Sequence, residues 1–127
     1  MSLDILVIDD ESDITSLISD ILADERYQVR VANNSDTALK ALADRVPSAI
    51  ILDIWLQGSE LDGLGILERV HAKYPHVPVI MISGHGTIEM AVSALQIGAY
   101  DFIEKPFKSD RILLMIMRAL ESAQLKK

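Results

Sequence analysis

The sequence places acidic, hydroxyl and amino side chains directly after four of its hydrophobic runs. Two of those runs lead into carboxylates, one ends in a hydroxyl group and one leads into an ammonium group. In a parallel sheet the carboxyl ends of all strands meet at one edge, so these side chains are expected to converge there. They are Asp9, Asp10, Glu11, Asp53, Ser83 and Lys105.

Carboxylates that converge in this way repel one another. Two charges ~5 Å apart at an effective dielectric constant of ~20 cost about 3 kcal/mol. Either one group is protonated or a cation lies between them. An oxygen-only cluster suits Mg²⁺, whose shell is ordinarily completed by water and phosphate oxygens. With an ammonium and a hydroxyl group nearby, the cluster has the parts needed for phosphoryl transfer, with Asp53 as the nucleophile.

Five hydrophobic runs are predicted to be strands. Three of them are nearly continuous in apolar residues, which is typical of strands covered on both faces. Each is followed by a segment with helical periodicity, so the pattern predicts an α/β fold with a parallel sheet and right-handed crossovers. The predicted strands span residues 3–8, 27–32, 49–53, 77–83 and 100–105.

The helices are predicted from periodicity and end signals. Apolar residues from Ile14 to Leu22 form an amphipathic stripe, and Ser35 stands where an N-cap residue would precede the second helix. A third helix covers 64–74, and a fourth covers 87–97 and ends at Gly98, a plausible left-handed C-cap. The fifth begins at about Ser109.

Composition excludes several classes of protein. The chain has 127 residues, enough for one domain, and no cysteine for disulfides or thiolate metal sites. Its formal net charge of -7 disfavours direct contact with nucleic acid. It has no apolar run that could span a membrane and no signal-peptide pattern, so a cytoplasmic protein is expected.

The ordered motifs "VIDDE", "IILDI", "DGLGIL", "VIMISG" and "GAYDFIEKPF" resemble the receiver domain of two-component response regulators. The resemblance covers the whole chain, and within the family it is strongest to the nitrogen-regulation NtrC/NtrX group, with the long loop after Asp53 resembling the NtrX branch. It implies a (βα)5 doubly wound, flavodoxin-like fold with strand order 2-1-3-4-5. Residues 1–127 would form one receiver domain, the N-terminal part of a longer transcription regulator.

The resemblance also implies roles for the acidic residues. Asp53 would accept a phosphoryl group from a sensor histidine kinase and later lose it by autodephosphorylation, so the domain would be a switch and not an enzyme. Asp10 would bind Mg²⁺ directly, Asp9 would assist mostly through water, and the carbonyl group of Trp55 would be a further ligand.

Further roles fall at the fourth and fifth strands. Ser83 would bond the phosphoryl group, Lys105 would form a salt bridge to it, and the Lys105–Pro106 peptide bond is expected to be cis. Phe102 occupies the aromatic switch position, where it would act by packing alone. Tyr100 is the nearby alternative.

Two features need separate mention: the length of the loop after Asp53 and the role of Glu11. Asp62-Gly63 follows the acceptor by nine residues where seven are common, so the loop at 54–62 is two residues longer. The geometry and access of the site are open at this point. Glu11 either lines the pocket or is an early-helix acid favoured by the helix dipole.

The last two helices are predicted to form a homodimer surface. Winding the fourth helix at roughly 100° per residue places Ile88, Ala91, Val92 and Leu95 on the core face. Apolar residues then remain on the outward side of this helix, and two more point away from the core in the fifth helix. This predicted dimer face, which flanks the fifth strand, consists of Met90, Ala94, Ile97, Leu114 and Met117.

Two other functions compete with the phosphorylation switch. A haloacid-dehalogenase-type phosphatase needs a second aspartate two residues after the nucleophile, and Trp55 stands there instead. A receiver used only for protein contact, without phosphorylation, is the second alternative, although every expected site residue is present.

Overall fold

The computed structural model describes residues 3–56, 62–84 and 88–125 and shows five strands alternating with five helices. Each predicted strand is present, with its ends moved by at most two residues. The strands are β1 (Asp4–Ile8), β2 (Gln28–Ala32), β3 (Ala49–Asp53), β4 (Val79–Ser83) and β5 (Asp101–Glu104). The helices are α1 (Ser12–Asp24), α2 (Ser35–Asp44), α3 (Gly63–Lys73), α4 (Ile88–Ile97) and α5 (Ser109–Leu125).

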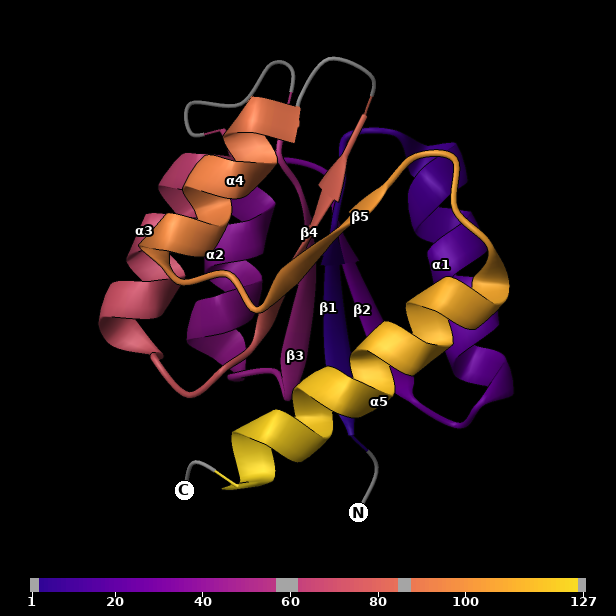
Figure 1. Cartoon of the computed structure of the whole chain (residues 1–127). Helices are drawn as coiled ribbons and strands as arrows, with labels where there is room; N and C mark the ends of the chain where they lie inside the picture. Colours follow the sequence, from indigo (N-terminus) through magenta and orange to yellow (C-terminus); the bar gives the residue numbers. More distant parts are fainter. Residues whose placement is uncertain (1–2, 57–61, 85–87, 126–127) are drawn as a thin grey trace.

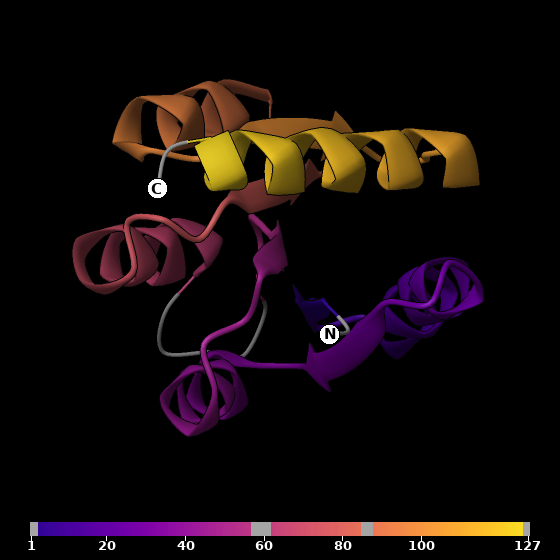
Figure 2. The ribbon, with the colours of Figure 1, turned by 90° about the horizontal axis from the view of Figure 1, so that it is seen from below.

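The strands form one parallel sheet in the order β2-β1-β3-β4-β5, which confirms the predicted topology. Helices α1 and α5 cover one face of the sheet, and α2, α3 and α4 cover the other (Figure 1). Figure 2, a view turned by 90°, shows the same two helical layers on either side of the strands. All five strands therefore present their carboxyl ends at one edge of the sheet.

Every residue of β1, β3 and β4 is buried, as the continuous apolar runs predict for strands covered on both faces. One hydrophobic cluster lies under α2, α3 and α4, and a second lies under α1 and α5. The chain therefore has two cores separated by a rigid sheet. The central strands that lead into the acidic residues are buried along their whole length.

The capping of α2 differs from its prediction. Its N-cap is Asn34, whose side chain accepts the N–H of Thr37 at 2.9 Å, while Thr37 reaches back to the Asn34 N–H at 3.4 Å. Ser35 is the first helical residue and is buried, so its predicted role as the cap was wrong by one position. The predicted positive backbone angle after α4 is confirmed, because Gly98 has φ +138°.

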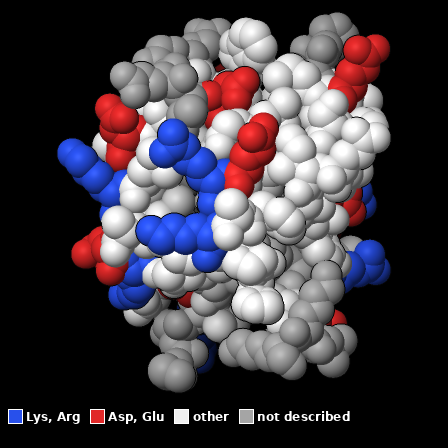
Figure 3. All heavy atoms as spheres, turned by 90° about the vertical axis from the view of Figure 1, so that its left-hand side faces the viewer, with Lys and Arg blue, Asp and Glu red and all other residues white. Residues whose placement is uncertain are grey.

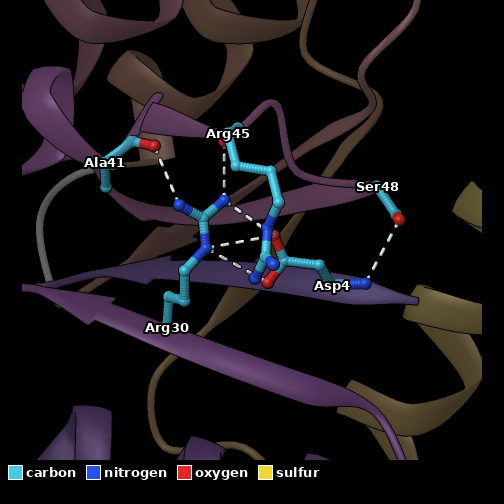
Figure 4. Close-up of polar contacts among 5 residues, drawn as sticks. All are labelled: Asp4, Arg30, Ala41, Arg45 and Ser48. Atoms are coloured by element: carbon cyan, nitrogen blue, oxygen red, sulfur yellow. Dashed lines mark hydrogen bonds and ion pairs between the residues drawn. The ribbon is translucent and has the colours of Figure 1, made fainter. Parts of the chain in front are cut away.

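An ion cluster around the buried Asp4 carboxylate ties β1 and β2 to the end of α2 (Figure 4). Arg30 donates to the Asp4 carboxylate through Nε (3.0 Å) and through its terminal nitrogen (2.7 Å). The same guanidinium group donates to the carbonyl oxygens of Ala41 and Arg45 at 2.8 and 2.7 Å. Both carbonyl groups lie at the C-terminal end of α2, and the Ala41 oxygen also accepts the Arg45 N–H at 3.1 Å. Arg30 therefore satisfies both a buried carboxylate and a helix terminus.

The orientation of α4 corrects the predicted core and dimer faces. Ala91 and Ala94 are completely buried, and Met90 and Ile97 are partly buried against the core. A decapeptide with one charged residue has apolar side chains on all sides, so its periodicity does not distinguish two faces. The two alanines allow the helix to approach the sheet closely. The outward residues are Ile88, Val92 and Leu95, with exposed fractions of 40, 47 and 38%.

The prediction for α5 is confirmed: Leu114 and Met117 are exposed, at 43 and 50%, while Ile112 and Ile116 are buried. Figure 3 shows the side of the molecule that carries α3 and α4, where a broad area without charged side chains adjoins a charged area.

Within the residues that the structure describes, no helix is long and apolar enough to cross a membrane.

Candidate functional site

The sheet register brings the ends of β1, β3, β4 and β5 together. Ile8 of β1 pairs with Leu52 of β3, so the next residues, Asp9 and Asp53, are neighbours at the edge of the sheet. On the other side of β3, hydrogen bonding continues past the strand ends. The Ile54 N–H donates to the Ile82 carbonyl (3.1 Å) and the Lys105 N–H donates to the Ser83 carbonyl (2.8 Å). The backbone therefore fixes the relative positions of these side chains.

Three aspartates form the acidic cluster that the sequence predicts. Asp9 is completely buried, Asp53 is 4% exposed and Asp10 is half-buried. Each offers a carboxylate oxygen, and these oxygens all lie within 4.8 Å of one another. An oxygen-only set of this size, open to water at Asp10, fits a hard divalent cation such as Mg²⁺.

Lys105 lies against this cluster and is shared between three carboxylates. Its Nζ atom is 3.4 Å from Asp9 Oδ2, 3.7 Å from Asp53 Oδ2 and 3.8 Å from Glu11 Oε1. Its side chain is only 18% exposed, so the charge is little screened by water. One ammonium group thus faces three acids and a fourth, Asp10, lies close by. The site carries an excess of negative charge.

This excess of negative charge, together with burial, shifts the pKa values of the groups in the cluster. Burial, and then the nearby Asp9 carboxylate, raise the pKa of Asp53 to about 7 against the opposing effect of Lys105. Burial also raises the pKa of Asp9, although the Glu11 N–H, which donates to Asp9 Oδ1 at 2.9 Å, opposes it. Burial alone would lower the pKa of Lys105, but the carboxylates of Asp53, Asp9 and Glu11 together raise it. A further cation at the cluster would allow both aspartates to ionise.

Ser83 adds a hydroxyl group at the end of β4. The residue is completely buried, and its Oγ atom has no hydrogen-bond partner among the residues that the structure describes. An unpaired buried hydroxyl group costs roughly 1–3 kcal/mol, so such groups are rare unless a ligand supplies the missing bond. Its position at the edge of the sheet suits a donor to an oxygen of a bound phosphoryl group.

The segment after Asp53 is held at both ends. Ile54 and Leu56 are buried, and Trp55 between them is 54% exposed and donates its N–H to Asp53 Oδ1 at 3.3 Å. Gly63, at the start of α3, donates to the Ile54 carbonyl oxygen at 2.9 Å. Residues 57–61 of the long loop, on which the expected effect on access to the site depends, lie outside the described residues. The role of the Trp55 carbonyl as a metal ligand remains a prediction.

One contact of the site, made by Asn33, was not predicted from the sequence. The side-chain amide of Asn33 donates to the Asp9 carbonyl oxygen at 2.9 Å and thereby supports the backbone of the acidic pair. Asn33 directly follows β2, so its position after a hydrophobic run was the available signal. For Glu11 both expected roles have support. It is the N-cap residue of α1, and its side chain lines the site by reaching Lys105.

The elements around β5 agree with the sequence expectations. The Lys105–Pro106 peptide bond is cis. Phe102 is half-buried and packs against the cluster under α2, α3 and α4, whereas Tyr100 packs against the cluster on the opposite face. Phe102 is therefore the aromatic residue of β5 on the α4 side. Its role as a switch remains a prediction.

A family model for the response regulator receiver domain matches residues 5–117. The chain belongs to this family, whose members are signalling domains and generally bind Mg²⁺. Its fold, strand order and the aspartate cluster at the strand ends are consistent with that membership.

Within the family the chain is similar to NtrX proteins. It is 54% identical over 127 residues to the nitrogen assimilation regulatory protein NtrX of Azorhizobium caulinodans, covering 100% of this chain and 28% of the relative. The crystal structure of the receiver domain of NtrX from Brucella abortus is 58% identical, with a TM-score of 0.91, covering 93% of this chain and 98% of that one. A beryllofluoride-activated NtrC4 receiver domain dimer is 38% identical, with a TM-score of 0.87, covering 94% and 98%.

The chain spans only about a quarter of the length of its curated relatives.

Proposed function

We propose that Asp53 accepts a phosphoryl group from a phosphohistidine of a sensor histidine kinase. The observation that carries this proposal is the placement of the Asp53 carboxylate, which a buried strand holds beside Asp9, Asp10 and the Lys105 ammonium. A nucleophile in phosphoryl transfer needs fixed geometry and neutralisation of charge more than it needs a base. The site supplies the fixed geometry through β3 and one positive charge through Lys105.

In the proposed transfer one Asp53 carboxylate oxygen forms a bond to phosphorus, and the nitrogen–phosphorus bond of the donor breaks. The leaving imidazole nitrogen keeps the electron pair and takes a proton from solvent. Lys105 neutralises the phosphoryl oxygens, and the buried Ser83 hydroxyl group donates a hydrogen bond to one of them. Hydrolysis of the acyl phosphate by water returns Asp53 to its carboxylate and resets the switch.

The residues that would hold Mg²⁺ are Asp9, Asp10, Asp53 and the carbonyl group of Trp55. When bound, the ion supplies positive charge next to the phosphoryl oxygens and removes the repulsion between the aspartates. Asp9 and Asp53 both have a raised pKa in the metal-free protein, which fits a cluster that is incomplete without a cation.

The proposed output is a change on the face formed by α4, β5 and α5. Movement of Ser83 and Lys105 toward the phosphoryl group would pull on the ends of β4 and β5 and let Phe102 repack under α4. The corrected exposed residues of this face would meet a second copy of the chain in a homodimer. They are Ile88, Val92, Leu95, Leu114 and Met117.

In this proposal residues 1–127 act as one receiver domain that controls an attached transcription-activator output in the cytoplasm. The domain itself would contact neither nucleic acid nor membrane. A receiver that signals only by protein contact is the alternative. The buried Ser83 hydroxyl group, which has no partner among the described residues, favours the phosphorylated form, because a contact module has no need of it.

The acceptor can be located chemically. After incubation with acetyl phosphate and Mg²⁺, borohydride reduction converts an aspartyl phosphate into homoserine, and peptide mapping then finds the altered residue. The proposal predicts the change at residue 53 alone. Modification at Asp9 or Asp10 in its place would overturn the assignment of the acceptor.

A further inference from the structure

Glu11 is an unusual helix cap. Its backbone is extended (φ -91°, ψ 110°) and its carbonyl oxygen accepts the N–H groups of Ile14 and Thr15, as an N-cap residue should. Yet its side chain makes no capping hydrogen bond. Shorter side chains such as Asp or Ser are strongly preferred at this position because they bond to the helix N–H groups. The longer glutamate side chain extends instead to Lys105 Nζ, 3.8 Å away.

Three carboxylates surround the Lys105 ammonium group. Their distances to Nζ span 3.4 to 3.8 Å, all longer than a good charge-assisted hydrogen bond of about 2.8 Å. Asp9 is the nearest of the three, but none of them holds the ammonium group at that short distance. Glu11 is the only one of the three whose side chain is largely exposed, at 61%, so water screens its attraction most. Glu11 is the partner that Lys105 would leave first.

We propose that Glu11 is a positioning residue of this site: it shares the Lys105 ammonium in the resting state and releases it when Asp53 carries a phosphoryl group. This inference rests on the proposed function of Asp53. A phosphoryl group brings two negative charges to the place where one carboxylate charge stood. Lys105 moves to those charges, and Glu11 at the start of α1 loses its partner. Glu11 thus competes with the phosphoryl group for the Lys105 ammonium group and shortens the lifetime of the aspartyl phosphate.

The test compares the half-life of the aspartyl phosphate in wild type, Glu11→Gln and Glu104→Gln at low ionic strength. Glu104 is the matched control, because it is exposed, directly precedes Lys105 in sequence and has no ion pair with Nζ. Glu11→Gln is expected to lengthen the half-life roughly two- to five-fold, and the gain should shrink as salt is added. Glu104→Gln is expected to change it less than two-fold.

A further variant separates the contact from net charge. Glu11→Asp keeps the charge but shortens the side chain by one methylene group, so it should favour the ordinary cap position and leave Lys105. If the contact matters, Glu11→Asp lengthens the half-life as Glu11→Gln does. Equal half-lives in wild type and Glu11→Gln, or equal gains in Glu11→Gln and Glu104→Gln, would overturn the inference while phosphorylation of wild type still supports the role of Asp53. Failure to label wild type at all would be a failure of the proposed function.

Discussion

The backbone N–H of Gly63 donates to the Ile54 carbonyl oxygen at 2.9 Å, which presses the first turn of α3 against the peptide that follows Asp53. A Cβ atom at Gly63 would come within 2.6 Å of the Ile54 α-carbon and would collide with the Asp53 carbonyl oxygen. Backbone atoms at this distance cannot move aside cheaply. The absence of a side chain at Gly63 is thus what lets the start of α3 lie against the backbone of Asp53 and Ile54.

Gly63→Ala should therefore lower the free energy of unfolding by roughly 1–3 kcal/mol, in the range of other overpacked sites. It should also slow phosphorylation, because the displaced backbone carries Asp53. Urea denaturation and acetyl phosphate labelling measure the two effects. Gly84→Ala is the control for stability, since a Cβ atom there would meet none of the described residues within 4 Å. Equal stability of the two variants would contradict this reading of the contact.

The acidic cluster makes stability depend on pH in a defined direction. The pKa of Asp53 is about 7 in the folded protein and 3.8 ordinarily, so the folded state holds a proton that the unfolded state releases. The resulting stability is complete below about pH 4 and is lost as pH rises through about 7. In chelator, wild type should be less stable at pH 8 than at pH 5.5.

Asp53→Asn removes this titration and should raise the free energy of unfolding at pH 8 by roughly 1–3 kcal/mol relative to wild type. The raised pKa of Asp9 acts in the same direction, so part of the dependence should remain in the variant. Mg²⁺ should stabilise wild type at pH 8 more than it stabilises Asp53→Asn. Denaturation curves with and without Mg²⁺ provide the comparison, and a variant less stable than wild type at pH 8 without metal would refute the explanation.

The ion cluster around Arg30 should matter for stability and not for phosphorylation. Arg30→Ala leaves the buried Asp4 carboxylate with a weaker partner, Arg45 at 3.4 Å, and should cost roughly 2–4 kcal/mol. Arg45→Ala is the matched control, because its side chain is 56% exposed and its loss should cost about 0.5 kcal/mol. Chemical denaturation gives both values. Similar losses of stability in the two variants would contradict the claim that the Arg30–Asp4 pair contributes more than the Arg45–Asp4 pair.

The homodimer face can be tested with exposed residues only. A double variant with Val92→Glu and Leu114→Glu places charge on α4 and α5 and should give a monomer in light scattering of the phosphorylated protein. Leu17→Glu, at a residue of α1 that is 47% exposed, should leave the mass unchanged. A dimer that survives the double variant but not Leu17→Glu would move the interface to α1.

Most of the fold was predictable because its signals are local and strong. Continuous apolar runs such as 49–53 identify buried parallel strands, and the residues that follow them must meet at one edge. The faces of α4 were not predictable, since nine of its ten residues carry no charge and the sheet alone selects which side is buried. The partners of Glu11 and Asn33 also required coordinates, because each contact joins residues far apart in sequence.

The central claim is that Asp53 is the phosphoryl acceptor of a metal-assisted site. The most direct measurement is intact-protein mass spectrometry of wild type and Asp53→Asn after incubation with acetyl phosphate and Mg²⁺. The account predicts a gain of about 80 Da in wild type only, absent when chelator is present. The same gain in Asp53→Asn, or no gain in wild type with either acetyl phosphate or a phosphorylated kinase, would contradict it.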